Sequence, residues 1–231
     1  HATLLARREM RAAVAPAVRR VRRALGWRRD EKFVSVIELR ELPLLGAHNA
    51  SNVAAALAAV RAALGDAVFA HRDAIAGALR DFQSLPHRLE IVAQKDGLTW
   101  VNDSQATIPD AAIGALRAFE GPVALIAGGK DKLNDPRGYD KLGVAIAERA
   151  HLLFTIGAAA PLIENAALRA SYDSDKIISA HTLQEAVHQA RKRMPPGGTV
   201  VLSPACASFD QFASYEQRGE TFRSLVLGLR A

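Results

Sequence analysis

The sequence predicts an α/β protein whose larger part is a doubly wound, mostly parallel sheet. From about residue 86 onward, short apolar runs alternate with segments of helical length, which is typical of a parallel sheet covered on both faces. Apolar residues make up 49% of the 231 residues, enough for a substantial core. Small and polar residues follow several of the apolar runs, where open α/β sheets bind their ligands.

Residues 1–85 are expected to form a linker and a helical packing unit. A β-like run covers residues 33–39 and is followed by a turn. An alanine-rich helix, capped by Asn49 or Ser51, then extends to about residue 64. A second helix is expected over residues 73–81.

The second part, residues 86–231, is expected to alternate strands and helices to its end. Two strands at 89–92 and 99–101 are joined by a turn at Asp96-Gly97. Further strands are expected at 123–127, 152–156, 177–179 and 199–202. Helices are expected at 110–119, 139–150, 161–170, 183–194 and from about 219. This makes one α/β domain of ordinary size.

The positive charge is local. The net charge is +6, yet residues 1–40 alone hold eleven Lys or Arg against four Asp or Glu. The arginines of segment 7–29 stand at roughly helical spacing, which favours a solvated helix face over a phosphate or membrane site. Aromatic residues are few and do not alternate with basic ones, so we expect no nucleic-acid partner.

Cysteine and hydropathy indicate the compartment. The single Cys206 excludes an intramolecular disulfide and a cysteine metal cluster, in agreement with a reducing cytoplasm. No apolar run approaches the length of a membrane helix, no usual signal peptide is evident, and no His, Asp or Glu spacing suggests a metal site. We expect a soluble cytoplasmic protein without a membrane span. Because the first residue is His, the chain is expected to begin inside a longer parent.

Two loops offer groups for an anionic ligand. Residues 102–107 read Asn-Asp-Ser-Gln-Ala-Thr and precede a helix, so Asp103, Ser104 and Thr107 either contact a ligand or only cap that helix. Residues 127–132 read Ala-Gly-Gly-Lys-Asp-Lys, where glycines permit close approach and lysines bring positive charge. An ordinary turn is the alternative for this second loop.

Two further loops are weaker signals. Residues 203–208 read Ser-Pro-Ala-Cys-Ala-Ser, and their amides and Ser208 could hold a carboxylate. Cys206 has no identifiable activating base, which favours buried packing over a nucleophile. In Pro86-His87-Arg88, Arg88 either grips a phosphate or is a surface arginine without a fixed partner. A phosphate loop and a dinucleotide fingerprint are absent, so residues that grip ATP are expected elsewhere in the parent.

Taken in order, five motifs resemble the Mur ligases, in particular the glutamate-adding members. They are Leu45-Gly46-Ala47-His48-Asn49-Ala50-Ser51-Asn52, Leu85-Pro86-His87-Arg88-Leu89-Glu90, Val101-Asn102-Asp103-Ser104-Gln105-Ala106-Thr107, Ala127-Gly128-Gly129-Lys130-Asp131-Lys132, and residues 202–212 with Arg218-Gly219 behind them. Five motifs in this order are far more specific than any one. The resemblance covers about residue 42 to the C-terminus.

The resemblance implies a three-domain parent, with an N-terminal domain for the UDP-sugar, a central ATPase and a C-terminal domain for the amino acid. Residues 1–85 resemble the tail of the central domain, and residues 86–231 the whole Rossmann-like C-terminal domain. The implied reaction belongs to peptidoglycan precursor synthesis. ATP activates UDP-N-acetylmuramoyl-L-alanine as an acyl phosphate, and glutamate attacks it. Mg²⁺ is implied, with ligands mostly on the missing central domain.

The resemblance also implies site residues. Those expected near ATP are Asn49, Asn52, Arg88 and Asp103. Those expected near glutamate are Gln105, Thr107, Lys132, Ser208 and the backbone at Tyr215. Most D-glutamate-adding members resemble a pattern with lysine at the position of Gln105, and Ile108-Pro109 also departs from it. These two differences slightly favour L-glutamate over D-glutamate.

Without a phosphate loop, the isolated chain is expected to be inactive. Two other classes of function stay open from the sequence. One is a stand-alone, non-catalytic α/β module that binds an amino acid or a nucleotide. The other is a basic nucleic-acid adaptor that uses residues 7–29, and it predicts salt-sensitive binding.

Overall fold

The computed structural model describes residues 18–21, 24–30 and 32–229. The chain divides into two compact units, residues 1–83 and 84–231. The roles expected from the sequence, the tail of a central ATPase domain and a glutamate-binding domain, remain predictions. Each unit has its own hydrophobic core and is described by itself.

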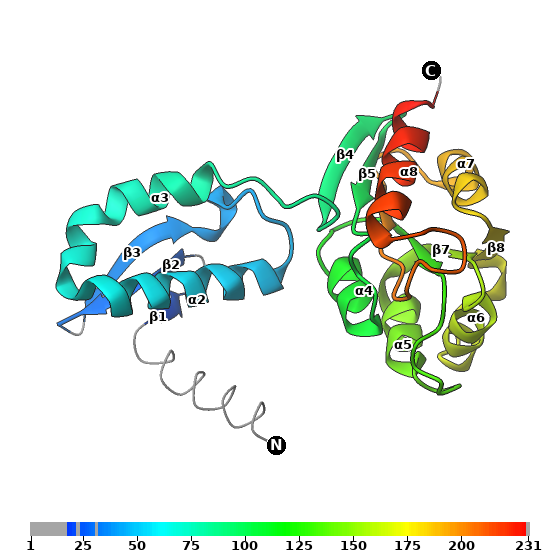
Figure 1. The fold of residues 1–231 in the computed structure, drawn as a ribbon, viewed down its shortest axis with the longest axis horizontal. Helices are drawn as coiled ribbons and strands as arrows, with labels where there is room; N and C mark the ends of the chain where they lie inside the picture. The colour runs from blue at the N-terminus through cyan, green and yellow to red at the C-terminus, as the bar shows by residue number, and fades with distance from the viewer. Residues whose placement is uncertain (1–17, 22–23, 31, 230–231) are drawn as a thin grey trace. The chain divides into compact units, whose positions relative to one another are not determined.

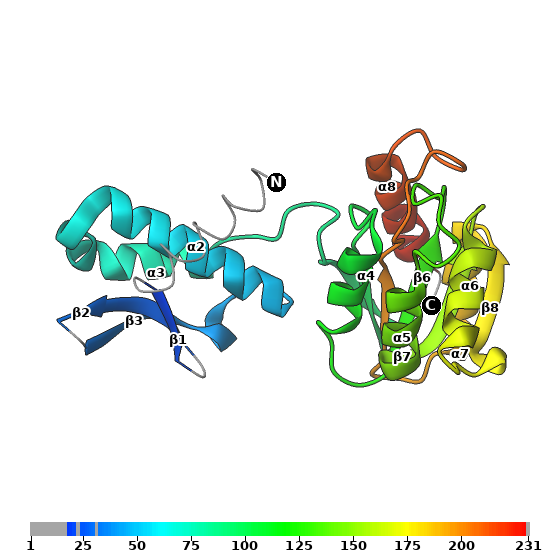
Figure 2. The ribbon, with the colours of Figure 1, turned by 90° about the horizontal axis from the view of Figure 1, so that it is seen from below.

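The first unit packs two α-helices on one face of a three-stranded antiparallel sheet of order β1-β2-β3 (Figures 1 and 2). Its elements are β1 (Val18–Val21), β2 (Ala24–Arg29), β3 (Lys32–Glu38), η1 (Leu39–Glu41), α2 (Ala47–Leu64), η2 (Gly65–His71) and α3 (Arg72–Arg80). Leu25, Trp27 and Ile37 of the sheet form its core with Leu57 and Val68 of the helical layer. Alternate residues of the strands face this layer.

The prediction of a helix face over residues 7–29 is wrong where the structure describes that segment. Val18–Val21 and Ala24–Arg29 are strands, and the remaining residues of the segment lie outside the described ranges. Trp27 explains the difference: it is fully buried and donates a 2.9 Å hydrogen bond from Nε1 to the carbonyl of Leu57. Pairing and burial outweigh the local spacing of the arginines.

The predicted cap of the alanine-rich helix is also wrong. Helix α2 begins at Ala47 with Gly46 at the N-cap, and no side chain caps it. The side-chain amide of Asn49 instead donates a 2.7 Å hydrogen bond back to the carbonyl of Leu45. The sequence placed the helix correctly but missed its start by one turn, because a glycine with φ of 89° turns the chain into it.

One stretch of the first unit, Asn49–Arg80, is long and apolar enough by length and composition to cross a membrane, which the sequence reading did not anticipate. The core helix of a soluble protein passes the same test of length and composition. The α-helix ends at Leu64, and a 3-10 segment follows before α3 begins. Val53 and Leu57 of α2 are buried in the core of the unit.

The second unit contains a six-stranded sheet of order β4-β5-β9-β6-β7-β8. Its strands are β4 (Glu90–Lys95), β5 (Leu98–Asn102), β6 (Val123–Gly128), β7 (Ala150–Ile156), β8 (Ile177–His181) and β9 (Thr199–Leu202). The edge strand β4 is antiparallel to β5, and all the other neighbours are parallel. Asp96 and Gly97, both at positive φ, form the tight turn that was predicted between β4 and β5.

Helices cover both faces of this sheet, which confirms the predicted fold class (Figures 1 and 2). They are α4 (Pro109–Leu116), α5 (Asp140–Arg149), α6 (Ala160–Arg169), α7 (Leu183–Arg193) and α8 (Tyr215–Leu227), with the 3-10 turn η3 (Ser174–Lys176). Helices α4, α5 and α6 pack side by side on one face, and α7 and α8 share the other. On that second face Trp100, Phe154 and Phe222 lie in the core.

The topology determines where the loops lie. Strands β5, β9 and β6 are parallel neighbours in the middle of the sheet, so their carboxyl ends meet at one edge. The loops that leave these ends carry residues 102–107, 203–208 and 127–132, which belong to three of the five sequence motifs. The carboxyl edge of a parallel sheet is the usual ligand side of this architecture.

Candidate functional site

Backbone hydrogen bonds join the three loops directly. The amide of Ala205 donates to the carbonyl of Ala106 (2.8 Å), which links the loop after β9 to the loop after β5. Lys130 and Ala207 exchange two bonds of 2.8 and 3.1 Å in an antiparallel bridge, which links the loops after β6 and β9. The predicted ligand-binding motifs therefore form one connected surface.

Asp103 lies buried between this surface and the start of β4. Its carboxylate accepts hydrogen bonds from the amide of Leu89 (3.1 Å) and the hydroxyl of Ser203 (2.7 Å). Burial raises its pKa to about 6, although these two hydrogen bonds and the guanidinium of Arg88 act in the opposite direction. Only 8% of Asp103 is exposed.

The capping alternative for this loop is wrong. The N-cap of α4 is Ile108, with no side-chain hydrogen bond to the first turn, and Pro109 stands at its start as expected. Ser104 is fully buried and donates a 2.7 Å bond to the carbonyl of Tyr215. Thr107 is half-buried beside it. Ser104 thus joins the predicted loop to the backbone at Tyr215.

Arg88 and Gln105 contact each other at the surface. The Nε of Arg88 donates to the side-chain oxygen of Gln105, and the amide of Gln105 donates a 3.1 Å bond to the carbonyl of His87. The alternative of an arginine without a fixed partner is therefore wrong. A residue expected near ATP and one expected near glutamate are direct neighbours.

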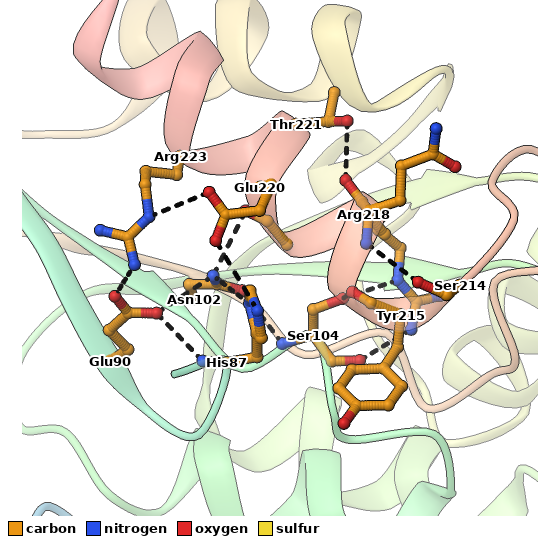
Figure 3. Close-up of polar contacts among 12 residues, drawn as sticks. His87, Glu90, Asn102, Ser104, Ser214, Tyr215, Arg218, Glu220, Thr221 and Arg223 are labelled. Atoms are coloured by element: carbon orange, nitrogen blue, oxygen red, sulfur yellow. Dashed lines mark hydrogen bonds and ion pairs between the residues drawn. The ribbon is translucent and has the colours of Figure 1, made fainter. Parts of the chain in front are cut away.

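His87, which precedes Arg88 in the chain, packs beside Asn102 and Glu90 (Figure 3). It is buried at a φ of 63°, its Nδ1 accepts a 3.0 Å bond from the amide of Asn102, and its backbone N–H donates to Glu90. A Cβ at Gly219 would lie 2.2 Å from His87 Nδ1, so only glycine fits there. This packing gives His87 a structural part in the loop before β4.

The loop after β6 is held by Asp131, the neighbour of Lys132. The carboxylate of Asp131 accepts bonds from the amides of Leu133 (3.0 Å) and Asn134 (3.1 Å) and from the hydroxyl of Tyr139 (2.8 Å). Lys132 itself is exposed. A fixed backbone with a free ammonium group suits the binding of an anion.

Ser208 and Cys206 lie in the loop after β9. Ser208 is only 2% exposed, at the end of the tied segment. Cys206 is buried with its Sγ 3.2 Å from the hydroxyl of Tyr139, and burial raises the pKa of the thiol to about 11. The expectation of buried packing rather than a nucleophile is confirmed.

The remaining predicted residues, Asn49 and Asn52, lie in the first unit. They stand one turn apart on α2, and the amide of Asn52 donates a 3.2 Å bond to the side-chain oxygen of Asn49. The described residues contain no cluster of three or more His, Cys, Asp or Glu side chains that could hold a metal ion.

Sequence reasoning missed the part that Arg218 plays. The motif Arg218-Gly219 is visible in the sequence, but an arginine on a helix is ordinarily exposed. In the structure its guanidinium is fully buried beneath the loops and donates to Ser104 and Cys206 (Figure 3). Tyr139, which joins Asp131 to Cys206, was missed for the same reason: such contacts arise only in the fold.

Comparison with known proteins places the chain among named relatives. A UDP-N-acetylmuramoylalanine–D-glutamate ligase of Pelotomaculum thermopropionicum is 44% identical over 190 residues, which are 82% of this chain and 40% of that protein. One of Acidobacterium capsulatum is 46% identical over 201 residues, 87% of this chain and 41% of that protein. The chain thus spans about two fifths of the length of these relatives.

A solved structure shares the fold. The bifunctional folylpolyglutamate synthase/dihydrofolate synthase of Yersinia pestis, complexed with AMPPNP and Mn ion, has a TM-score of 0.52 and 18% identity and covers 89% of this chain and 44% of its own. The model of the family described as Mur ligase, glutamate ligase domain, matches residues 87–206, more than half of the chain. The chain belongs to the Mur ligase family and carries its glutamate ligase domain.

Proposed function

We propose that this chain is the C-terminal part of an ATP-dependent ligase that joins glutamate to UDP-N-acetylmuramoyl-L-alanine in peptidoglycan precursor synthesis. The observation that supports this most is the set of backbone hydrogen bonds that joins the three strand-end loops to which Thr107, Lys132 and Ser208 belong. The names of the curated relatives point to the same reaction. The parent is proposed to include the N-terminal and central domains, because the relatives are more than twice as long.

The proposed chemistry has two steps. The acceptor carboxylate takes the γ-phosphoryl group of ATP, and ADP leaves. The glutamate amine then attacks the acyl carbon, the C–O bond to phosphate breaks, inorganic phosphate leaves and the amine loses a proton. Amide formation needs this activation because a free carboxylate is a poor electrophile. The chain's own part is to hold glutamate so that its amine faces the acyl carbon.

Glutamate carries two carboxylates, so it requires two separate anion grips. We assign these to the ammonium of Lys132, the hydroxyls of Thr107 and Ser208, the side chain of Gln105 and the backbone at Tyr215. The exposed lysine beside a fixed backbone and the buried Ser208 offer one mobile and one rigid contact. Charge-assisted bonds of this kind are the strong ones at such a site.

For ATP we propose Arg88 and Asp103 in the second unit and Asn49 and Asn52 in the first. The contact between Arg88 and Gln105 links the nucleotide residues to the glutamate residues. The solved structure of the same fold was obtained with AMPPNP and Mn ion, which supports a nucleotide and a divalent cation. The described residues offer no cluster of three or more metal-binding side chains, and the ligands of the cation are proposed to lie mostly on the central domain.

The enzyme's preference for L- or D-glutamate can be tested directly. The sequence slightly favoured L-glutamate, but the curated relatives at 44 and 46% identity are named D-glutamate ligases, and we therefore propose D-glutamate. The full-length parent should release phosphate from ATP in the presence of UDP-N-acetylmuramoyl-L-alanine and D-glutamate, and far less with L-glutamate. The reverse preference would overturn this assignment, and no release with either would overturn the function.

A Gln105→Lys variant tests the effect of the glutamine that this chain has where most D-glutamate-adding members resemble a pattern with lysine. A lysine there would stand beside the guanidinium of Arg88 and could not accept its hydrogen bond. We therefore expect a higher KM for ATP in the variant, measured in the same assay. The preference between the glutamate enantiomers should stay as in the wild type. A reversed preference would show that this position sets handedness.

A further inference from the structure

Arg218 on α8 is a buried cation that contacts two of the three loops. Its side chain is 0% exposed. The guanidinium donates from Nε to the hydroxyl of Ser104 (3.0 Å), from Nη2 to the carbonyl of Ser104 (2.8 Å) and from Nη1 to the carbonyl of Cys206 (3.2 Å). Figure 3 shows the side chain of Arg218 beside Ser104, apart from the cluster of Glu90, Glu220 and Arg223. The planar fork thus joins the loop after β5 to the loop after β9.

The third loop passes directly over the same group. A Cβ built at Gly129 would lie 3.2 Å from Nη1 of Arg218 and 3.3 Å from the Cβ of Cys206. Gly129 therefore lets the loop after β6 lie against the guanidinium. Every loop that carries a residue assigned to glutamate meets at this one side chain.

All three acceptors of Arg218 are neutral. Among the described residues no carboxylate lies within ion-pair distance of its guanidinium. Burial lowers its pKa to about 10, while the negative charge of Asp210, which makes no ion pair with it, acts in the opposite direction, so the group remains charged at neutral pH. A buried charge with no carboxylate in direct contact is costly to the fold, and such groups concentrate at functional sites.

We propose that Arg218 is a positioning residue for the anionic amino-acid substrate: it holds the three loops in one arrangement and supplies a fixed positive charge beneath them. The inference rests on the proposed function, because it takes the dicarboxylate as a counter-charge that adds to the more distant Asp210. A charge that is already desolvated acts more strongly on a nearby anion than a hydrated one does. Binding of glutamate therefore relieves part of the cost of the buried cation.

Two substitutions separate charge from shape. Arg218→Met removes the charge at similar length, and Arg218→Lys keeps a charge but loses the fork. The test uses the full-length ligase and measures KM for glutamate, KM for ATP and kcat, after thermal unfolding has shown that the variants are folded. Arg169→Met is the matched control, because Arg169 pairs with Asp140 at the surface of the same unit.

For Arg218→Met we expect KM for glutamate to rise on the order of tenfold or more, while KM for ATP changes by less than about twofold. Arg218→Lys should show a smaller rise in KM for glutamate, and Arg169→Met should show none. An unchanged KM for glutamate, or equal rises for both substrates, would overturn the proposal. If Arg218→Met does not fold, the proposal is tested by Arg218→Lys, in which KM for glutamate should rise more than KM for ATP.

A wild-type enzyme whose steady-state phosphate release does not depend on glutamate would refute the proposed function, and this inference with it. A wild-type enzyme with normal glutamate dependence and unselective Arg218 variants would refute only the inference. The two failures are therefore distinguished within one set of measurements.

Discussion

Asp103 combines two opposing influences on a single carboxyl group. Removal from water favours its protonated form, and the hydrogen bonds from Leu89 and Ser203 favour its charged form. Desolvation is the larger influence, so the pKa lies near 6 in the folded chain, above the 3.8 of a free aspartate. The folded state therefore binds the proton more tightly than the unfolded state.

This predicts a specific pH dependence of stability. A raised folded pKa gives stability that is present below the unfolded value and is lost as pH rises through about 6, a loss of about 3 kcal/mol. Asp103→Asn should lack this decline. Urea unfolding at about pH 4 and 7, followed by Trp100 fluorescence in a Trp27→Phe background, measures it. The same slope in both proteins would contradict the prediction.

Lys132 and Lys130 allow a matched comparison within one loop. Both side chains are exposed, but only Lys132 follows Asp131 and is assigned to glutamate. Lys132→Ala should raise KM for glutamate by on the order of tenfold or more, because a charge-assisted bond to a carboxylate is lost. Lys130→Ala should have a much smaller effect. Equal rises of KM for glutamate in both variants of the full-length enzyme would show instead that the general positive charge of the loop binds glutamate.

Cys206 should be chemically inert while the chain is folded. Its thiol is buried against Tyr139, and a pKa of about 11 leaves very little thiolate at pH 8. Reaction with an aromatic disulfide reagent is expected to be slower by roughly a hundredfold or more than in denaturant. Rapid modification of the native chain would instead reveal an opening of the loop after β9.

The bridge between the loops after β6 and β9 depends on Gly129. At this position φ is 132°, and an added Cβ would lie 2.3 Å from the carbonyl of Ala207. Gly129→Ala should destabilise the second unit by about 2 kcal/mol or more. Gly121→Ala is the control, because Gly121 also has a positive φ but nothing within 4 Å of an added Cβ. A similar loss of thermal stability in both variants would mean that backbone strain alone matters.

The strands and helices of the second unit were predictable because each is long and strongly patterned. Buried strands such as Val123–Gly128 are continuous apolar runs, and glycine or proline separates them from the helices. Helix α8 was expected from about 219 but begins at Tyr215, where the hydroxyl of Ser214 accepts from the amide of Gln217. The strand Ala24–Arg29 was missed because burial of Trp27, a non-local event, determines it.

The candidate site was predictable only in part. The loops could be located, since residues at strand ends can be counted along the sequence. Their contacts could not: that Arg88 touches Gln105, or that Tyr139 joins Asp131 to Cys206, depends on strand order. Strand β9 lies between β5 and β6, and no local sequence pattern predicts that order. The buried guanidinium of Arg218 follows from the same arrangement.

The division into two units predicts that residues 84–231 fold on their own. Their sheet and both helical layers are complete within that range, and 148 residues are an ordinary size for a domain. Expressed alone, this segment should give a cooperative thermal transition by circular dichroism. A segment of residues 98–231, which lacks the edge strand β4, is the control and should melt lower. Failure of the longer segment to fold would show that it depends on the first unit.

The paired bonds between Lys130 and Ala207 restrict how this architecture can change. An insertion or deletion in either loop would shift the register of the bridge and displace both segments together. Divergence of substrate preference at this edge must therefore proceed through exchange of individual side chains while loop lengths stay constant. Directed evolution of the domain toward other amino acids should accordingly yield point substitutions at residues 105, 107, 132 and 208 rather than length variants.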